Sequence, residues 1–398
     1  MTSTVKIPEW WTDTTLGEIA TFQQWFQIST DFQELEKKEW YVRFVRIVDY
    51  TNEWEKPRYI EDPHRCFVNE DDLVMIRYWS QTAGKIVRGI SWVIANNTFQ
   101  VITWNNTNKN RLYRNLKQES VYNYLNRDQS SSTMPAITFS QVSKLPIILP
   151  PLPEQKAIAG VLSSFDDKIE LLRTENQTLE EMGQTLFKER FGKYKVWDEL
   201  PDGWKVGRLG DIGDIICWKT PDKSESRFYG WEIPFIKIPD MHWNVFIIKT
   251  EDSLSEIWAN TQKNKYIPSW AICVSCIATV WLVSITTKIS QTNQQINSIV
   301  LFKKEFLEYT YYILSWMYNY LLWLWSWWSA TLNINTWTFS NISLIIPEWN
   351  TISKFHSLAW PIFTKIKTNS EEIESLSKTR DQLLPKLMSW EVRVEFYS

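Results

Sequence analysis

The fold is decided by the stretch Pro150-Pro-Leu-Pro-Glu-Gln-Lys-Ala-Ile-Ala-Gly-Val-Leu-Ser-Ser-Phe-Asp-Asp-Lys-Ile-Glu-Leu-Leu172. Pro153 suits the first turn of a helix, where its missing N–H is not needed, and Glu154 would face the positive end of the helix dipole. Apolar residues then recur every three or four positions as far as Leu186, which predicts one long helix reaching Gly192. About 39 residues at 1.5 Å each give a rod of roughly 60 Å. Such a rod in mid-chain indicates a spacer, and the alternative is an ordinary amphipathic core helix.

A second helix near the end of the chain has the matching pattern. Apolar residues repeat at heptad-like spacing from Ile362 to Leu387, and Asn369 and Arg380 are polar interruptions, as Asn176 is in the first helix. We expect the two helices to pair through Ile169, Leu172, Leu179, Leu186, Ile366, Ile373, Leu376 and Leu383.

The chain is also duplicated internally. Pro8-Glu-Trp-Trp11 and Leu16-Gly-Glu-Ile19 recur as Pro201-Asp-Gly-Trp204 and Leu209-Gly-Asp-Ile212 at a constant offset of 193 residues, which also carries Trp25 onto Trp218. Each half closes with Thr-Phe-Ser, at Thr138 and at Thr338, followed by an apolar run ending in proline. Matching frames around differing middles are typical of two modules that share a scaffold and recognise different targets.

These motifs resemble the conserved regions of a known protein family. The block Leu149-Pro-Pro-Leu-Pro-Glu-Gln-Lys-Ala-Ile-Ala-Gly-Val-Leu162, the following Asp-Lys-Ile-Glu, and Arg380-Asp-Gln-Leu-Leu-Pro-Lys-Leu-Met-Ser389 are similar to those of the specificity subunit of type I restriction-modification systems. The resemblance implies an α+β protein with two mixed, mostly β target-recognition domains separated by two long helices paired as an antiparallel coiled coil. It implies a first recognition domain at 1–150, a central helix at 151–192, a second recognition domain at 199–347 and a C-terminal helix at 348–390.

The middle of each module alternates short β-rich runs with polar turns, as expected for a mostly β domain. The expected strands cover 41–48, 73–78 and 99–103 in the first module and 235–238, 245–248, 271–284 and 296–302 in the second. A helix is expected at 306–322.

Several polar stretches have the chemistry of DNA contacts. Asn and Gln bond adenine bidentately, whereas Lys and Arg reach guanine or phosphate. In the second module the candidates are Lys219, Thr220, Lys237, Asp240, Met241, Gln291, Thr292, Asn293, Gln294 and Gln295, and they also resemble the family's recognition signatures. In the first module we expect Arg77, Tyr78 and Lys85 to take a comparable place, and the basic window 103–127 contributes Lys109, Arg111 and Arg114 as a phosphate patch. The alternative for each stretch is a solvated turn or loop.

The numbers of cysteines and histidines argue against a disulfide-stabilised protein and against a metalloprotein. The 398 residues carry a net charge of −3, four cysteines and three histidines, so we expect no disulfide framework and no metal site. Cys273-Val-Ser-Cys276 is a lone CxxC pair. The N-terminus has no apolar run of the kind found in signal peptides, and we expect a cytoplasmic protein.

The chain lacks the sequence motifs of nucleotide hydrolysis and of DNA methyl transfer. It contains no glycine-rich phosphate loop and no Asn-Pro-Pro-Tyr or Asp-Pro-Pro-Tyr run of amino-methyltransferases. We therefore expect no catalytic residues. The resemblance implies double-stranded DNA, two methyltransferase subunits and restriction/translocase subunits as partners, with S-adenosylmethionine, ATP and Mg²⁺ on those partners.

Two alternatives belong to other classes. One is a scaffold or membrane protein, since residues 309–328 are mostly apolar, although polar side chains interrupt them and no basic flank follows. The other is an enzyme, for example an orphan methyltransferase fragment, which the missing motifs argue against. The scaffold alternative includes an orphan coiled-coil scaffold or a methyltransferase-associated fragment without a restriction partner.

The tryptophan content is unusual. The sequence has 25 Trp and 11 Gly, whereas glycine is normally about 7% of residues. Trp218, Trp281, Trp390 and the 323–328 cluster stand where the family pattern has glycine, and Trp10 stands opposite Gly203 in the repeat. We hypothesise that UGA codons read as glycine in the host are represented as tryptophan, while Trp11 and Trp204 are genuine. The alternative is true aromatic enrichment.

Overall fold

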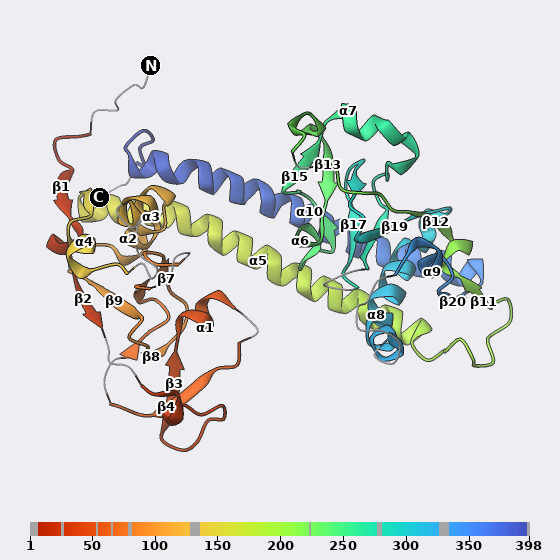
Figure 1. Ribbon diagram of the computed structural model, residues 1–398, viewed down its shortest axis with the longest axis horizontal. Coiled ribbons are helices and arrows are strands. Elements are labelled where there is room, and N and C mark those ends of the chain that lie inside the picture. Colours follow the sequence, from red (N-terminus) through yellow and green to blue (C-terminus); the bar gives the residue numbers. More distant parts are fainter. Residues whose placement is uncertain are drawn as a thin grey trace. The chain divides into compact units, whose positions relative to one another are not determined.

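The computed structural model describes residues 7–24, 28–52, 55–64, 67–78, 82–127, 136–222, 224–276, 281–325 and 334–395. Two compact units divide the chain: the first holds residues 1–166 and 378–398, and the second holds 167–377. Figure 1 labels their helices and strands. Each unit contains one module and part of each long helix, and each is described by itself below.

The first unit begins and ends its module with one antiparallel pair of strands, β1 with β10, in which Thr12 pairs with Leu149. Two four-stranded sheets follow, in the orders β2-β9-β6-β7 and β4-β3-β8-β5. The strands are β1 Thr12–Thr15, β2 Ala20–Gln24, β3 Tyr41–Val45, β4 Arg58–Glu61, β5 Phe67–Val68, β6 Leu73–Ile76, β7 Ile86–Val87, β8 Trp92–Ile94, β9 Thr98–Thr103 and β10 Pro146–Leu149. Their apolar faces are buried in separate clusters around Phe99 and around Phe44.

Short helices cover the first module. They are α1 Ile47–Thr51, α2 Lys109–Leu116, α3 Glu119–Asn126 and α4 Phe139–Ser143, with 3₁₀ turns at Leu16–Glu18 and Thr30–Phe32. Leu112 and Leu116 of α2 and Leu125 of α3 are buried in the same hydrophobic cluster as Phe99 of strand β9. Thr138 caps α4 by accepting from the Gln141 N–H at 3.2 Å.

The second unit repeats this arrangement. The pair β11–β20 frames it, and its sheets have the orders β12-β19-β16-β17-β14 and β15-β13-β18. The strands are β11 Lys205–Arg208, β12 Gly213–Ile216, β13 Tyr229–Ile236, β14 Phe246–Ile247, β15 Asp252–Leu254, β16 Ile272–Ser275, β17 Val283–Thr286, β18 Gln291–Thr292, β19 Ile296–Leu301 and β20 Ser343–Ile346. The helices are α6 Ile238–Met241, α7 Glu256–Ala259, α8 Leu307–Trp325 and α9 Thr336–Ser340, with 3₁₀ turns at Leu209–Asp211, Ser226–Phe228, Asn260–Lys265 and Lys304–Phe306.

Strand pairing shows that the two modules are copies. In the first, β2 pairs with β9 and β9 with β6; in the second, β12 pairs with β19 and β19 with β16, all antiparallel. The parallel pairing of β3 with β8 recurs as that of β13 with β18. The expected duplication and the α+β fold are therefore confirmed.

The long helices are α5 Leu152–Phe191 and α10 Trp349–Met388, of 40 residues each. In the second unit, Phe187 and Phe191 of α5 share one buried cluster with Phe355 and Phe363 of α10. In the first unit, Ile158 and Leu162 of α5 contact Leu387 and Met388 of α10, together with Trp11. The N-terminal part of α5 thus packs against the C-terminal part of α10 in the first unit, and the C-terminal part of α5 packs against the N-terminal part of α10 in the second. The two helices are therefore paired antiparallel.

The first turns of helix α8 pack into the protein, whereas Trp316 is exposed. Tyr309, Tyr311 and Tyr312 are at most 4% exposed and lie in the same cluster as Phe187. Among the described residues, no helix combines the length and the hydropathy needed to span a membrane.

Several strand predictions were wrong in their bounds. The strand expected over 41–48 ends at Val45, because Asp49 accepts the Arg46 N–H at 2.7 Å and starts helix α1. The strand expected over 73–78 ends at Ile76. The one expected over 271–284 is two antiparallel strands, β16 and β17, and residues 277–280 lie outside the described part. The two Thr-Phe-Ser motifs belong to α4 and α9, and each of these short helices precedes a closing strand.

Tryptophan occupies the left-handed backbone region to an unusual extent. Within the described residues, seven non-glycine residues have positive φ, and six are tryptophans with φ from 63° to 102°: Trp40, Trp92, Trp243, Trp270, Trp281 and Trp390. Only glycine adopts these angles without a steric penalty from Cβ. Trp281 and Trp390 were expected here from the sequence, whereas Trp10 and Trp218 have no positive φ, and Trp25 and 326–328 lie outside the described residues.

Candidate nucleic-acid interface

A buried polar pair sets the alignment of α5 and α10 in the second unit. Asn369 is completely buried, and its Nδ2 donates to Oδ1 of Asn176 and to Oε2 of Glu175, both at 2.9 Å. Asn176 Nδ2 donates in turn to Ser370 Oγ at 3.2 Å. A shift by one turn would leave these groups unpaired in an apolar seam, so the pair specifies one register.

A charged triad does the same in the first unit. Asp166 of α5 accepts from Arg380 of α10 at 2.7 Å and forms an ion pair with Arg114 of α2 at 2.6 Å. Burial alone would raise the pKa of Asp166, but the hydrogen bonds and positive charges of Arg380 and Arg114 prevail and lower it. The triad joins both long helices to the first module.

Asp166→Asn is expected to lower the free energy of unfolding by about 1 kcal/mol at pH 7, at the upper end for partly exposed ion pairs. Because the folded-state pKa of Asp166 is depressed, its contribution is present above the ordinary carboxyl pKa and is lost as the pH falls through the lower folded value. Urea unfolding at pH 7 and at pH 3 checks this, since the difference between variant and parent should shrink at acid pH. Asp167→Asn, at the neighbouring carboxylate, is the control, and equal losses for both variants would contradict the assignment.

The residues expected to pair the helices lie along the seam to different depths. Ile169, Leu172 and Ile366 are at most 2% exposed, while Ile373, Leu376 and Leu383 are partly exposed. Leu179 and Leu186 pack against the core of the second module. Leu383 packs against the cluster of Ile158 and Leu162.

In the first module, Arg77 lies just beyond β6 at the end of the central sheet. Its Nη1 donates to Gln24 Oε1, and its guanidinium lies 5.1 Å from the Tyr78 ring centre and 5.6 Å from that of Phe139. Lys85 is exposed, with its Nζ 5.9 Å from the ring centre of Tyr122. Arg77 and Tyr78 are partly exposed, so all three expected residues lie at least partly at the surface of this unit.

The expected phosphate patch is largely structural. Arg111 is 1% exposed and donates to the carbonyl of Ile148 at 2.9 Å, and burial lowers its pKa to about 10. Arg114 is 8% exposed and belongs to the Asp166 triad, and Lys109 forms an ion pair with Asp72 at 2.7 Å. A count of charges along the sequence could not distinguish these internal partners from exposed cations.

In the second module, Thr220 and Gln294 bind one another at the surface. Gln294 Oε1 accepts from the Thr220 N–H at 2.9 Å and from its hydroxyl at 2.7 Å. Lys219 is exposed beside them, with Nζ 5.6 Å from the Trp218 ring centre. The structure therefore brings these three expected residues together.

The other expected residues of the second module are mostly internal. Gln291, Thr292, Asn293 and Met241 are at most 6% exposed. Gln291 Nε2 donates to the carbonyl of Ala259 at 3.0 Å, and Gln295 Oε1 accepts from Asn293 at 3.0 Å. The amide-rich run thus exposes its side chains chiefly at Gln294.

Lys237 and Asp240 form a strand-to-helix junction. Asp240 accepts the Lys237 N–H at 2.8 Å, and Lys237 Nζ lies 2.7 Å from Glu251 and 2.9 Å from Asp252. Burial raises the pKa of Asp240 despite the backbone hydrogen bonds from Lys237 and Glu251. These contacts give both residues a role in shaping the turn.

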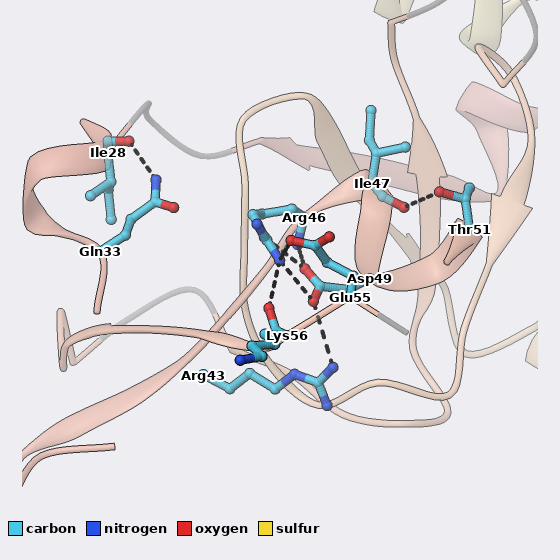
Figure 2. Close-up of polar contacts among 9 residues, drawn as sticks. All are labelled: Ile28, Gln33, Arg43, Arg46, Ile47, Asp49, Thr51, Glu55 and Lys56. Atoms are coloured by element: carbon cyan, nitrogen blue, oxygen red, sulfur yellow. Dashed lines mark hydrogen bonds and ion pairs between the residues drawn. The ribbon is translucent and has the colours of Figure 1, made fainter. Parts of the chain in front are cut away.

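The equivalent junction in the first module was missed from the sequence. Arg46 follows β3 as Lys237 follows β13, and Asp49 accepts its N–H as Asp240 accepts that of Lys237. Figure 2 shows Arg46 between Asp49, at 3.0 Å, and Glu55, at 3.2 Å, with Arg43 approaching Asp49 at 3.8 Å. The shared pattern of a basic residue followed three positions later by Asp could have identified it. The place comparable to Lys237 is therefore that of Arg46 and not that of Arg77.

Comparison with known proteins agrees with this duplicated architecture. A family model described as the type I restriction modification DNA specificity domain matches residues 8–181 and 201–373. Both modules and most of both long helices are covered.

Individual relatives carry the same description. The HindI specificity subunit of a type I restriction enzyme from Haemophilus influenzae is 39% identical over 334 residues, covering 67% of this chain and 73% of the relative. The MjaIX specificity subunit from Methanocaldococcus jannaschii is 29% identical over 299 residues, covering 71% of this chain and 69% of the relative.

A solved structure shows the same fold. It is the S subunit of a type I restriction-modification system from M. genitalium, with a TM-score of 0.60 and 16% identity over 97% of this chain and 99% of that one. Duplicated modules, paired helices and the match of the family model over both halves lead to one conclusion: the chain belongs to the family of type I restriction-modification DNA specificity subunits.

Proposed function

We propose that this subunit recognises a split DNA site, with one half read by each module, and that the helix pair sets the length of the unread gap. The observation that carries the proposal is the duplication itself: the same strand frame occurs twice, and each copy is anchored to the α5–α10 pair. Two similar modules on one scaffold suit two targets at a fixed separation.

The surfaces proposed to meet DNA are formed by expected residues that are exposed or partly exposed. They are Arg77, Tyr78 and Lys85 in the first module and Lys219, Thr220 and Gln294 in the second. Basic and amide side chains of this kind contact phosphates and base edges. Arg111, Gln291 and Met241 stabilise the modules from inside and are left out of the proposed contacts.

The same proposal assigns the chemistry to other subunits. Two methyltransferase subunits would dock on the helix pair, and restriction/translocase subunits would join them. S-adenosylmethionine, ATP and Mg²⁺ would be bound by those partners. Support comes from the family of this chain and from its relatives, which are named as specificity subunits of type I restriction enzymes.

Removing one heptad from each helix tests the spacer. The Asn176–Asn369 pair places residues 168–174 opposite 371–377, and deleting both segments leaves that pair and the Asp166 triad intact. Seven residues span about 10.5 Å of helix, or roughly three base pairs. We expect the complex to methylate both half-sites with a gap about three base pairs shorter.

Deletion of 168–174 alone is the matched control, because it misaligns the polar pairs and should abolish assembly. Unchanged spacing after the double deletion, or altered half-sites, would overturn the role of the helices as a spacer.

A further inference from the structure

The two modules place corresponding residues at one end of their central sheets. Ile76 pairs with Thr98 and Ser275 pairs with Ile296, so Arg77 corresponds to Cys276 and the Asn96-Asn97 turn corresponds to Gln294-Gln295. Ala20 pairs with Thr103 and Gly213 with Leu301, which makes Gln24 the counterpart of Cys217. We name this end of each module the sheet-end cluster: Gln24, Arg77, Asn96 and Asn97 in the first, and Cys217, Cys276, Gln294 and Gln295 in the second.

The backbone of the cluster is the same in both copies. The Arg77 N–H donates to the Asn97 carbonyl at 2.9 Å, and the Cys276 N–H donates to that of Gln295 at 2.7 Å. The Gln24 side chain donates to the Asn96 carbonyl, and the Cys217 thiol donates to that of Gln294 at 3.7 Å. The two modules thus share the backbone hydrogen bonds of the cluster but carry different side chains there. In such an arrangement the recognised bases can change while the fold is kept.

In the first module the cluster holds an arginine in a fixed orientation. Gln24 is anchored to the Asn96 carbonyl through its nitrogen, and its oxygen accepts from Arg77 Nη1, while Tyr78 and Phe139 flank the guanidinium. Among the described residues, the buried atoms Arg77 Nε and Asn97 Oδ1 have no hydrogen-bond partner. The cluster therefore has unused hydrogen-bonding capacity around a preorganised guanidinium.

In the second module the same place has different chemistry. Cys276 is 1% exposed, accepts from Asn297 Nδ2 at 3.1 Å, and has a pKa raised to about 12 by burial. The exposed group is the carboxamide of Gln294, whose oxygen is held by Thr220, so its NH₂ is the group presented. The two clusters thus present different donors.

We propose that Arg77, positioned by Gln24, reads a guanine in the half-site of the first module. An arginine fork matches the O6 and N7 acceptors of guanine in the major groove, and its support from Gln24 and two rings reduces the entropy lost on binding. This inference rests on the proposed function and names the base that one module recognises. Tyr78 and Phe139 are positioning residues for the guanidinium.

The test uses the complex reconstituted with its methyltransferase subunits and a DNA library randomised in both half-sites. Arg77→Lys keeps the charge but loses the planar fork, and it should weaken the preference for guanine at one position of one half-site about tenfold or more. Gln24→Leu, which keeps Arg77 but removes its anchor, should weaken the same position to a smaller extent. The other half-site should be unchanged in both variants.

Cys276→Ser at the corresponding place of the second module is the control and should alter neither half-site. Unchanged base preferences in Arg77→Lys, or a uniform loss of affinity at every position, would overturn the role of Arg77. If the Arg77→Lys subunit fails to assemble with the methyltransferase subunits, the guanine preference of the Gln24→Leu complex tests the role of Arg77 instead. A parent complex without any split-site preference would instead refute the proposed function.

Discussion

Peptides of this protein from its native host are expected to carry glycine in place of Trp40, Trp92, Trp243, Trp270, Trp281 and Trp390. All six have positive φ, while three glycines share this backbone region in the described residues. A Cβ in this region costs roughly 1–2 kcal/mol per residue, so tryptophan is an unfavourable choice at each position. Mass spectrometry of tryptic peptides distinguishes the residues directly.

Tryptophan at Trp281 and Trp390 in the native protein would contradict this expectation, and tryptophan at Trp218 would weaken the wider recoding hypothesis. Trp218 is 9% exposed, and its indole N–H has no hydrogen-bond partner among the described residues, which is costly for a buried donor. The φ angle of Trp218 is not positive and gives no support for glycine at this position. Only the peptide measurement can decide between tryptophan and glycine at position 218.

Recombinant variants give the same hypothesis an energetic test. Trp40 and Trp243 are 77% and 74% exposed, so replacing them by glycine removes strain with little loss of packing. We expect Trp40→Gly and Trp243→Gly each to raise the free energy of unfolding by about 1 kcal/mol, or about 2–4 °C in Tm. Trp231, which is 95% exposed within strand β13, is the matched control. Trp231→Gly should lower stability, because glycine weakens a strand.

Leu172→Glu is expected to disrupt the helix pair. Leu172 is 2% exposed on α5, and the register of Asn176 with Asn369 places Ile373 opposite it. An unpaired carboxylate in this seam, together with the lost leucine packing, should cost about 3–5 kcal/mol. Circular dichroism during thermal unfolding should show a lower Tm, and the chain should fail to recruit methyltransferase subunits in size-exclusion chromatography.

The neighbouring Leu171 provides the control, since it is 62% exposed on the same turn. Leu171→Glu should leave both Tm and recruitment close to those of the parent. Full recruitment by Leu172→Glu would show that methyltransferase docking does not depend on the paired seam. Equal loss from both variants would indicate that any new charge on α5 is harmful.

The paired helices could be predicted from the sequence because their pattern is local. Apolar spacing identified both helices, and Asn176, Asn369 and Arg380 stood out as polar residues in an apolar stripe. Their partners required the fold: Asn176 binds Asn369, whereas Arg380 binds Asp166, a residue with an equally acidic neighbour in Asp167.

The DNA-contact candidates were harder to place because exposure depends on long-range pairing. Gln291 and Gln294 are three residues apart in one polar run, yet β18 buries the first and the following turn exposes the second. Arg111 looked like a surface cation, although it packs beneath the Trp11 ring and the Ile148 carbonyl. Gln24, Asn96 and Arg77 come from three separate segments, and only the strand register brings them together.

Sequencing of methylated bases in the host genome tests the central claim most directly. The account predicts a methylated motif of two specific half-sites with different sequences, separated by an unread gap of constant length. A motif read continuously without a gap, or two half-sites at variable spacing, would contradict recognition by two modules joined by the paired helices.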